Sequence, residues 1–475
     1  ELTDVIVAAC RKDFYFFCQY MDPDFFSDDK PHLKIIADAY QDVADGRTRK
    51  LAISLPPRAG KSYITSLFCA WWIGKNPKEA VMRNSYGAEL AETFSYFIRG
   101  LMTNDKYLKV FPVKLKKDKQ SINDWALETA KQTTYFCGGV GGPLTGKGAK
   151  LIILDDPIKG IEEALSETII EKTWNWYGGV HMARREKDYI NIHIATRWSR
   201  KDPIGRLTDP ESEFYDPEFK VIKIPALNEK GESYCEALMS TKEYLEQKRV
   251  LDDFIWEAEF MQNPIESKGL LYPSEELKRF SMKEIDSKTP DGIIGYTDTA
   301  DRGDDFLCSV IGKSFGGYTY ITDVVFSQDG VEITEPLVAQ MIIDSKCERM
   351  VIESNNGGYQ YARNVQNLIE KKWRCQVSAK PQTTNKETRI LMNSGYVKEF
   401  FYFRNDYEPG SDYDKFYRAL TSYVKLGKNK HDDAPDAVTG LAEIMRYEVF
   451  LRPEPPKIYN FSWERPKADP GGYGE

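Results

Sequence analysis

One short segment constrains the fold most: an apolar run followed at once by a glycine–lysine–serine turn. Residues 50–55 have the composition of a buried strand, residues 59–62 read Ala-Gly-Lys-Ser, and a helical pattern continues through Trp72. A strand, a glycine-bearing turn and a helix in this order are the context of a phosphate-binding loop. Backbone amides and the helix N-terminus attract phosphate oxygens there. The segment therefore predicts a nucleotide site in an α/β domain.

The loop departs from the full pattern G-x-x-x-x-G-K-[ST], because Leu55 stands where the first glycine belongs. By itself, the motif is also compatible with an ordinary strand–helix turn. Two later strand ends favour the nucleotide site. The apolar run 151–154 ends in Asp155 and Asp156, and the run 190–195 ends in Thr196. Adjacent carboxylates after a buried strand are costly unless a cation compensates them. Strands that alternate with helices in this way predict a parallel sheet.

Each candidate residue at these strand ends has an expected role. We expect nucleotide contacts from Pro57, Arg58, Ala59, Gly60, Lys61, Ser62, Asp155 and Thr196. Lys61 would neutralise phosphate charge, and Ser62 and Asp155 would hold Mg²⁺. Asp156 would polarise the attacking water, so that Arg58, Lys61 and Asp156 are the catalytic candidates. The simpler alternatives are a strand cap at 155–156 and a plain strand end at Thr196.

Acidic residues also end three elements in the second half of the chain. The run 292–297 ends in Asp298, the run 349–352 ends in Glu353, and the last helix opens with Asp432, Asp433 and Asp436. These ends would be neighbours in a fold with RNase H-like order, and oxygen-rich sites suit Mg²⁺, with Mn²⁺ as an alternative. Two such ions about 4 Å apart can activate a water and stabilise a departing 3′ oxygen.

All five acids are metal-ligand candidates, and Asp298, Glu353 and Asp433 are also catalytic candidates. The alternatives are a turn aspartate at 298 and helix N-capping by Asp432 or Asp433. Asp432 and Asp436 are four residues apart, and Asp433 and Asp436 are three apart. Either pair could therefore share a helix face.

Composition limits the other possibilities. The 475 residues include 65 basic and 73 acidic side chains, so the chain is not a basic nucleic-acid coat and DNA contact requires local patches. The candidate patches are 106–119, 371–386 and 425–430; the alternative is that such charges are simply solvated. Four histidines and eight cysteines without a CxxC pair argue against a histidine-rich centre or a structural zinc site. No run of 18 apolar residues exists to span a membrane.

The order of patterns predicts four regions. Residues 1–205 would form N-terminal helices and the phosphate-loop core, and 206–290 a lid and linker rich in charge and proline. Residues 291–450 would form a second α/β unit of RNase H-like order, and 451–475 a flexible tail rich in proline and glycine.

With these groups in place, the chain resembles the large terminase subunit of tailed bacteriophages, the genome-packaging ATPase–nuclease. The resemblance covers roughly residues 30 to 445. It is carried by His32–Ser62, Ser85–Glu92 with Arg99, Gly141–Lys159, Thr196–Trp198 with 205–207, Phe254–Pro264 and the acids at 298, 353 and 432–436. It implies an α/β chain with a RecA-like P-loop ATPase domain followed by an RNase H/RuvC-like nuclease domain.

The resemblance also implies individual roles. Arg58 corresponds to the basic residue of the family's phosphate loop, and Thr196 to a motif that couples hydrolysis to movement. Asp156 stands where the family usually has a glutamate base. The match leaves open which of Asp432, Asp433 and Asp436 bind metal.

As a function, the resemblance implies a viral motor that uses ATP to drive double-stranded DNA into a procapsid and cuts concatemers with a metal-dependent endonuclease. The expected partners are double-stranded DNA, a portal protein and a small terminase subunit. A homo-oligomeric ring would form on the portal, with a monomer in isolation as the alternative. The expected location is the host cytoplasm, with transient docking on the procapsid. The alternatives are a helicase or repair-type ATPase–nuclease, and a translocase whose RNase H-like domain only grips DNA.

Overall fold

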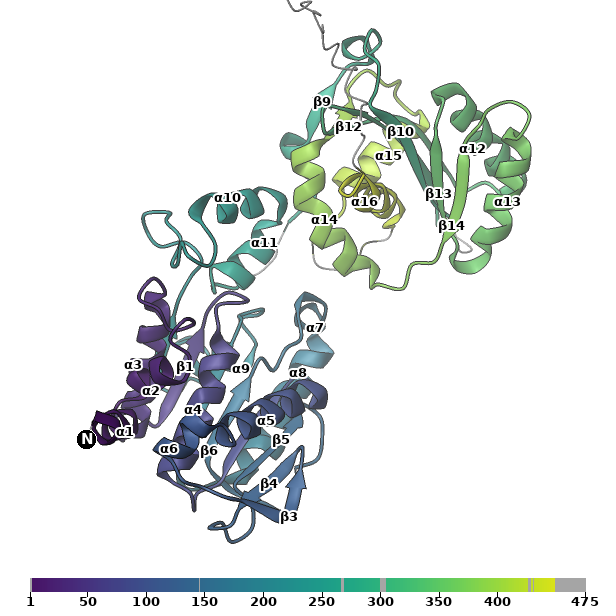
Figure 1. The fold of residues 1–475 in the computed structure, drawn as a ribbon. Coiled ribbons are helices and arrows are strands. Elements are labelled where there is room, and N and C mark those ends of the chain that lie inside the picture. Colours follow the sequence, from purple (N-terminus) through teal and green to yellow (C-terminus); the bar gives the residue numbers. More distant parts are fainter. Residues whose placement is uncertain are drawn as a thin grey trace, which may run out of the picture.

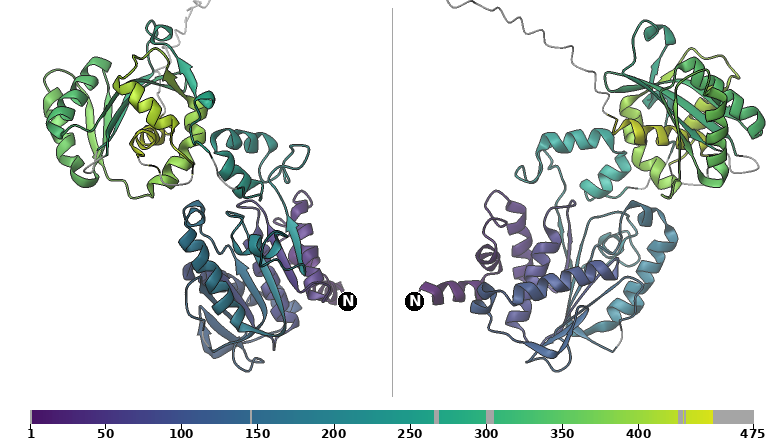
Figure 2. Two further views of the ribbon diagram at one scale, coloured as in Figure 1. Left: turned by 180° about the vertical axis from the view of Figure 1, so that it is seen from behind. Right: turned by 45° about the vertical axis from the view of Figure 1, so that its right-hand side comes forward.

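The structure is a computed structural model and describes residues 2–144, 146–265, 269–299, 305–425, 429 and 431–448. Two α/β domains lie at opposite ends, with a small helical region between them (Figures 1 and 2). The tail predicted at 451–475 lies outside the described residues. None of the helices in the described part of the chain has the length and apolar run needed to span a membrane.

The first domain is built on an eight-stranded sheet with the order β3-β4-β5-β2-β6-β7-β1-β8. The strands are β1 (Lys50–Ser54), β2 (Val81–Ser85), β3 (Leu115–Ser121), β4 (Asp124–Leu127), β5 (Tyr135–Gly139), β6 (Ala149–Asp155), β7 (Arg185–Ala195) and β8 (Phe219–Lys223). Neighbours from β5 to β8 pair in parallel, whereas β3 and β4 are antiparallel additions at one edge. The predicted parallel sheet is confirmed. The two edge strands were not predicted.

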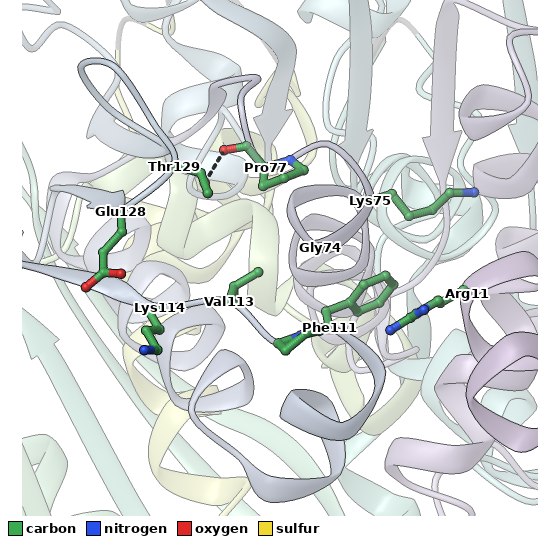
Figure 3. Close-up of a pocket in the computed structure, with 10 residues that line it drawn as sticks. Arg11, Gly74, Lys75, Pro77, Phe111, Val113, Lys114, Glu128 and Thr129 are labelled. Atoms are coloured by element: carbon green, nitrogen blue, oxygen red, sulfur yellow. Dashed lines mark hydrogen bonds between the residues drawn. The ribbon is translucent and has the colours of Figure 1, made fainter. Parts of the chain in front are cut away.

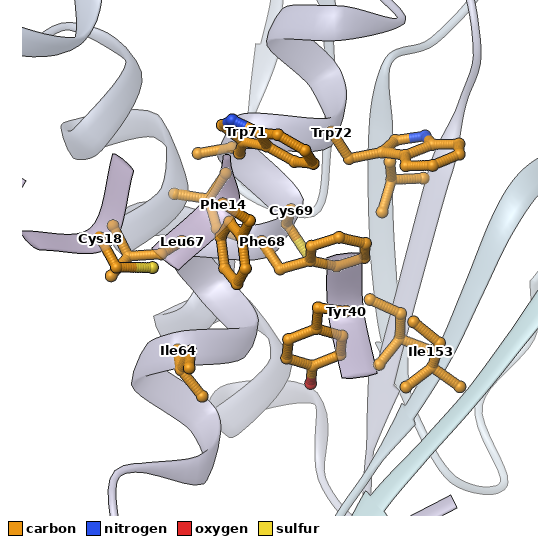
Figure 4. Packing of buried hydrophobic residues seen from close by; sticks show 14 of the residues in the cluster. Phe14, Cys18, Tyr40, Ile64, Leu67, Phe68, Cys69, Trp71, Trp72 and Ile153 are labelled. Carbon is orange, nitrogen blue, oxygen red and sulfur yellow. The ribbon is translucent and has the colours of Figure 1, made fainter. Parts of the chain in front are cut away.

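Helices cover both faces of this sheet, as parallel strands require. They are α1 (Leu2–Lys12), α2 (Phe14–Met21), α3 (Pro31–Ala44), α4 (Lys61–Lys75), α5 (Ala88–Met102), α6 (Asp105–Val110), α7 (Ile161–Leu165), α8 (Glu167–Trp176) and α9 (Pro203–Thr208). Aromatic rings from α2, α3 and α4 pack together in the core (Figure 4). Tyr40 stacks on Phe68 with centroids 4.4 Å apart, and Trp71 is fully buried.

The helical region between the domains contains α10 (Thr241–Val250), α11 (Asp253–Ile255) and a π-helical turn (Trp256–Phe260). Its small core joins Tyr244, Trp256 and Phe260 to Ala226 and Leu227. The range predicted as lid and linker contributes more than this region. It also supplies β8 to the first sheet and β9 (Lys278–Phe280) to the second. Short strands at sheet edges carry little apolar pattern, which is why the sequence did not reveal them.

The second domain has a seven-stranded sheet in the order β14-β13-β10-β11-β12-β15-β9. Its other strands are β10 (Gly292–Asp298), β11 (Leu307–Phe315), β12 (Tyr318–Ser327), β13 (Arg349–Glu353), β14 (Gln376–Lys380) and β15 (Phe401–Arg404). The strands β10, β11 and β12 form an antiparallel meander, and β13 joins β10 in parallel. This is the predicted RNase H-like order.

Five helices cover this second sheet. They are α12 (Val331–Ser345), α13 (Gly358–Ile369), α14 (Lys386–Phe400), α15 (Asp412–Thr421) and α16 (Asp433–Met445). The helices α12 and α13 pack on one face, and α14, α15 and α16 on the other (Figure 1). The sequence did not predict α14. Eight of its fifteen residues are buried, several of them polar, so it lacks the single apolar stripe that marks a surface helix.

Candidate functional site

The phosphate loop lies between the end of β1 and the start of α4. Gly60 has a φ of 82°, and a Cβ atom there would come within 2.7 Å of the Phe25 ring, so this position requires glycine. Arg58 also has a left-handed φ, 60°, and its side chain is exposed. Left-handed backbone at a non-glycine residue is strain that clusters at binding sites.

Three predicted residues meet at this loop. The Lys61 Nζ atom donates to Thr196 Oγ1 at 2.7 Å and lies 3.0 Å from Asp156 Oδ2. The backbone amide of Thr196 donates to the other Asp156 oxygen at 2.8 Å. Strands β1, β7 and β6 are neighbours in the sheet, so their carboxyl ends bring these side chains together. Asp156 has a φ of 43°, a second strained residue at the same edge.

Asp155 is fully buried beside the loop and has a partner that the sequence reasoning missed. Ser62 Oγ donates to Asp155 Oδ1 at 3.4 Å, and Arg83 Nε donates to Oδ2 at 3.0 Å. Burial raises the pKa of Asp155, and the Arg83 guanidinium opposes that rise. One signal was available: a charged side chain inside the buried strand 81–85 implies a buried counter-charge.

A second missed group comes from the helical region. Glu259 lies in the π-helical turn, and burial raises the pKa of its carboxyl to about 7, with Lys61 as the opposing charge. Gln262, two residues after this turn, accepts a hydrogen bond from the backbone amide of Arg197 at 3.0 Å. The helical region therefore contacts the strand end that carries Thr196. Nothing in the sequence pattern at 254–264 indicated this contact.

In the second domain, three predicted acids form one cluster. Oxygen atoms of Asp298, Glu353 and Asp436 all lie within 4.8 Å of one another, and all three residues are buried. Strands β10 and β13 end at the same edge because they are parallel neighbours, and α16 packs against β10. Burial raises the pKa of Asp298 well above its usual range. Three buried carboxylates at this spacing fit Mg²⁺ or Mn²⁺.

Two cations from α14 enter this cluster. Lys386 Nζ lies 3.2 Å from Asp298, 3.1 Å from Asp436 and 2.8 Å from Asp432. Burial lowers the pKa of Lys386, but these carboxylates outweigh burial and the net direction is upward. Arg389 pairs with Asp436 and lies 3.7 Å from Glu353. Lys386 belongs to a patch that was expected to contact DNA beside the nuclease acids, and the structure places it among these acids; the DNA contact stays a prediction.

A second group of possible ligands also includes a residue at the start of α16. It consists of Asp305, His431 and Asp433. Phe306 donates its amide to Asp433 at 3.2 Å, and its ring meets the His431 ring edge-on at 5.2 Å. The sequence reasoning favoured a nuclease site made of carboxylates alone and so missed His431.

The three acids at the start of the last helix therefore have different neighbours. Asp436 belongs to the first cluster, Asp433 belongs to the second, and Asp432 belongs to neither. Asp432 instead pairs with Lys386. The predicted sharing of a helix face did not reveal this separation.

The basic segment 106–119 folds as α6 and the edge strand β3. Lys116 and Lys119 donate to backbone carbonyls of Ala130 and Gln132, at 2.7 and 2.6 Å. Lysines on an edge strand also hinder pairing with other chains. The predicted role of this segment in DNA binding stays a prediction. In the patch at 425–430, Lys428 and Lys430 lie outside the described residues.

One pocket, of about 670 Å³, lies away from both sites. Its lining includes Arg11, Gly74, Lys75 and Phe111, and Thr129 donates to the Pro77 carbonyl at its rim (Figure 3). Gly74 and Lys75 end the 15-residue helix α4, whereas the phosphate loop precedes it, a separation of about 20 Å. This pocket therefore takes no part in the chemistry of the two sites.

One family model matches part of the second domain. Residues 297–394 match the model of the Ribonuclease H-like domain of the bacteriophage T7 terminase. This segment is therefore similar to a terminase RNase H-like domain. The matched range contains Asp298, Glu353, Lys386 and Arg389, and the acids of α16 follow it in the chain.

The terminase assignment agrees with the fold of the whole chain. The large terminase of a thermophilic bacteriophage is similar at a TM-score of 0.51 and 10% identity, over 89% of this chain and 99% of its own. The complex of that terminase with ADP gives 0.50 and 12% identity, over 89% and 100% of the two chains. The resemblance to large terminases is thus confirmed, by family for residues 297–394 and by fold for the chain.

One further terminase structure is similar to part of the chain. The manganese-soaked nuclease domain of the human cytomegalovirus terminase is similar over 35% of this chain and 89% of its own. Its identity of 11% and TM-score of 0.28 support no conclusion by themselves. No curated protein matches the sequence.

Proposed function

We propose that this chain is a viral DNA-packaging motor that hydrolyses ATP to translocate double-stranded DNA into a procapsid and cuts concatemeric DNA. One observation carries the proposal: a single chain holds a phosphate loop beside two strand-end acids and, in its terminase RNase H-like domain, a cluster of three buried carboxylates. The large terminase of the thermophilic bacteriophage, whose structure was determined with ADP, supports the nucleotide assignment.

At the loop, Lys61 is the residue that ATP would engage first. Its ammonium is held by Asp156 and Thr196, so binding of β- and γ-phosphate oxygens draws it away from Asp156. The freed Asp156 oxygen then accepts the proton of the attacking water, while the Thr196 amide keeps the carboxylate oriented. Ser62 and Asp155 would hold Mg²⁺, which would supply positive charge to the phosphate oxygens.

At the terminase domain, Asp298, Glu353 and Asp436 would hold one divalent ion, Mg²⁺ or Mn²⁺, and Asp433 with Asp305 and His431 would supply ligands for a second. A bound ion would supply Lewis-acid stabilisation to the departing 3′ oxygen. Lys386 must move away from the carboxylates before an ion can occupy the first position, because its ammonium lies within 3.2 Å of Asp298 and Asp436.

The proposal includes the binding partners of the chain and its location in the host cell. The chain would act on double-stranded DNA as a ring on a portal protein, receive DNA from a small terminase subunit, and work in the host cytoplasm while docked on the procapsid. A domain that only grips DNA is the alternative. The crowding of Lys386 and Arg389 among the acids is the observation that favours this alternative.

Two variants of the full chain test the proposal. Lys61→Met should abolish ATP hydrolysis, measured as phosphate release with Mg²⁺, and leave plasmid cleavage measured without nucleotide. Asp298→Asn should abolish plasmid cleavage with Mg²⁺ or Mn²⁺ and leave ATP hydrolysis. Unimpaired hydrolysis in the first variant would refute the ATPase assignment. DNA binding without any cleavage in the unmodified chain would establish the gripping alternative.

A further inference from the structure

The helix α14 contacts both the carboxylate cluster and the helical region. Its first turn carries Lys386 and Arg389, which lie among the carboxylates of the terminase domain. Its middle lies against the helical region: a Cβ atom on Gly395 would come within 2.5 Å of the Leu251 backbone. A straight helix of 15 residues moves as one body, so a displacement of its middle displaces the two cations.

A short segment connects the middle of α14 to the phosphate loop. At its start, the buried carboxylate of Asp252 accepts from Ser394 at 3.4 Å and pairs with Lys398 at 3.8 Å and Lys425 at 3.3 Å. At its end, the Gln262 side chain accepts from the Arg197 amide. Arg197 directly follows Thr196, the hydrogen-bond partner of Lys61. Two contacts thus anchor the segment 252–262, one in each domain.

The body of this segment packs into the second α/β domain and into the helical region. Phe254 and Ile255 belong to the core of the terminase domain, whereas Trp256 and Phe260 belong to the core of the helical region. A second contact supports the same connection, because Ile161 of α7, five residues after Asp156, also packs into the terminase-domain core.

Two backbone features of this segment are uncommon. Residues 256–260 form a π-helical turn, and the buried Gln262 has a φ of 55°. Such conformations are retained where surrounding contacts hold them. The contact of Gln262 with the Arg197 amide is one of these contacts, so its loss would remove support from the segment.

We infer that Gln262 and Asp252 are positioning residues that couple the phosphate loop to the metal site of the terminase domain through the segment 252–262 and α14. Occupancy of the loop by ATP then changes where Lys386 and Arg389 stand among the carboxylates, and so changes the cutting rate. This inference rests on the proposed function. By thermodynamic linkage, metal binding at the carboxylates changes nucleotide affinity by the same factor.

The experiment uses the full chain and supercoiled plasmid at a fixed free Mn²⁺ concentration. The cleavage rate is measured with and without a saturating, slowly hydrolysed ATP analogue that carries sulfur on the γ-phosphate. We expect the analogue to change the rate of the unmodified chain about fivefold or more. In Gln262→Met and in Asp252→Asn, the rate without nucleotide should stay within about twofold of the unmodified chain, and the analogue should then change it by less than about twofold.

The matched control is Arg249→Ala. Arg249 pairs with Glu399 across the same α10–α14 contact but is largely exposed, so this variant should keep the full response to the analogue. A response that persists in both anchor variants, or that is absent in an unmodified chain with both activities, overturns the inference. Absence of either activity in the unmodified chain instead refutes the proposed function. Loss of the response in Arg249→Ala as well would show a general loosening of the interface and would also overturn the role of the two anchors.

Discussion

The phosphate-loop residues and the carboxylate cluster of the second domain balance their acidic side chains in different ways. In the first, each acid faces its own cation: Arg83 pairs with Asp155, and Lys61 pairs with Asp156. In the second, Lys386 and Arg389 stand among a larger number of acids, including Asp298, Glu353, Asp432 and Asp436. One site is close to neutral without a ligand, and the other has excess negative charge.

This difference agrees with the ligands proposed for the two sites. A phosphate group would draw Lys61 away from the Asp156 carboxylate, as proposed for the first site. Excess buried carboxylate is costly unless a cation is added, so the second site suits divalent metal.

The largest effect should come from the three acids at the start of α16. Asp436→Asn removes a ligand from the three-carboxylate cluster and should lower the Mn²⁺-dependent cleavage rate by about 10²-fold or more. Asp432→Asn is the matched control, because Asp432 belongs to neither cluster, and its effect should be about tenfold or less. Initial rates of plasmid linearisation measure both. Equal losses would contradict the division between Asp432 and Asp436.

A large loss of stability should follow from Arg83→Met. The variant leaves Asp155 buried without its guanidinium partner, so the free energy of unfolding should fall by about 3–5 kcal/mol. Denaturant unfolding followed by tryptophan fluorescence measures the change. In the double variant with Asp155→Asn, which removes the unpaired charge, much of the loss should be recovered. If the free energy of unfolding falls by less than about 1 kcal/mol, a group other than Arg83 compensates the charge of the Asp155 carboxylate.

A smaller effect is expected from Lys386→Met. Its ammonium and a divalent ion compete for the carboxylates of Asp298 and Asp436, so the variant should bind Mn²⁺ about tenfold more tightly, a change of about 1.4 kcal/mol. Isothermal titration of the full chain measures the affinity. Lys380→Met, an exposed lysine on β14, should leave it unchanged. Weaker binding in Lys386→Met would show that this lysine supports the site and does not compete for it.

A further effect concerns pH and the helical region. The pKa of Glu259 in the folded chain is about 7 and its ordinary value is 4.5, so the unfolded chain loses this proton first as pH rises. The contribution of Glu259 to stability is therefore present below pH 4.5 and is lost as pH rises towards 7. Glu259→Gln should therefore stabilise the chain more at pH 8 than at pH 5. The gain in the free energy of unfolding that the substitution causes should be larger at pH 8 by on the order of 2 kcal/mol.

The same denaturant titrations at the two pH values check this prediction. Glu229→Gln, at an exposed loop residue, is the control and should leave the pH dependence unchanged. If the free energy of unfolding of Glu259→Gln depends on pH as it does in the unmodified chain, the Glu259 carboxyl is exposed to water and does not lie close to Lys61.

Much of the fold was predictable because it is recorded in short, regular patterns. Each apolar run that precedes one of these polar residues forms a strand, and the polar residue lies at or shortly after the strand end. The residues are at positions 61, 155, 196, 298 and 353. Parallel strands then bring such ends together, which is why Lys61, Asp156 and Thr196 were predicted correctly as neighbours. The helix α14 and the edge strands escaped prediction because their residues do not alternate with a single period.

The sequence by itself determined two α/β units, the phosphate loop and the carboxylates that end strands. Only the tertiary structure decided which charge compensates which. Arg83 lies 72 positions from Asp155, and Lys386 lies 88 positions from Asp298. Periodicity reports how a residue faces its own helix or strand, whereas a buried charge is balanced by whichever side chain the packing of distant elements brings within a few ångströms.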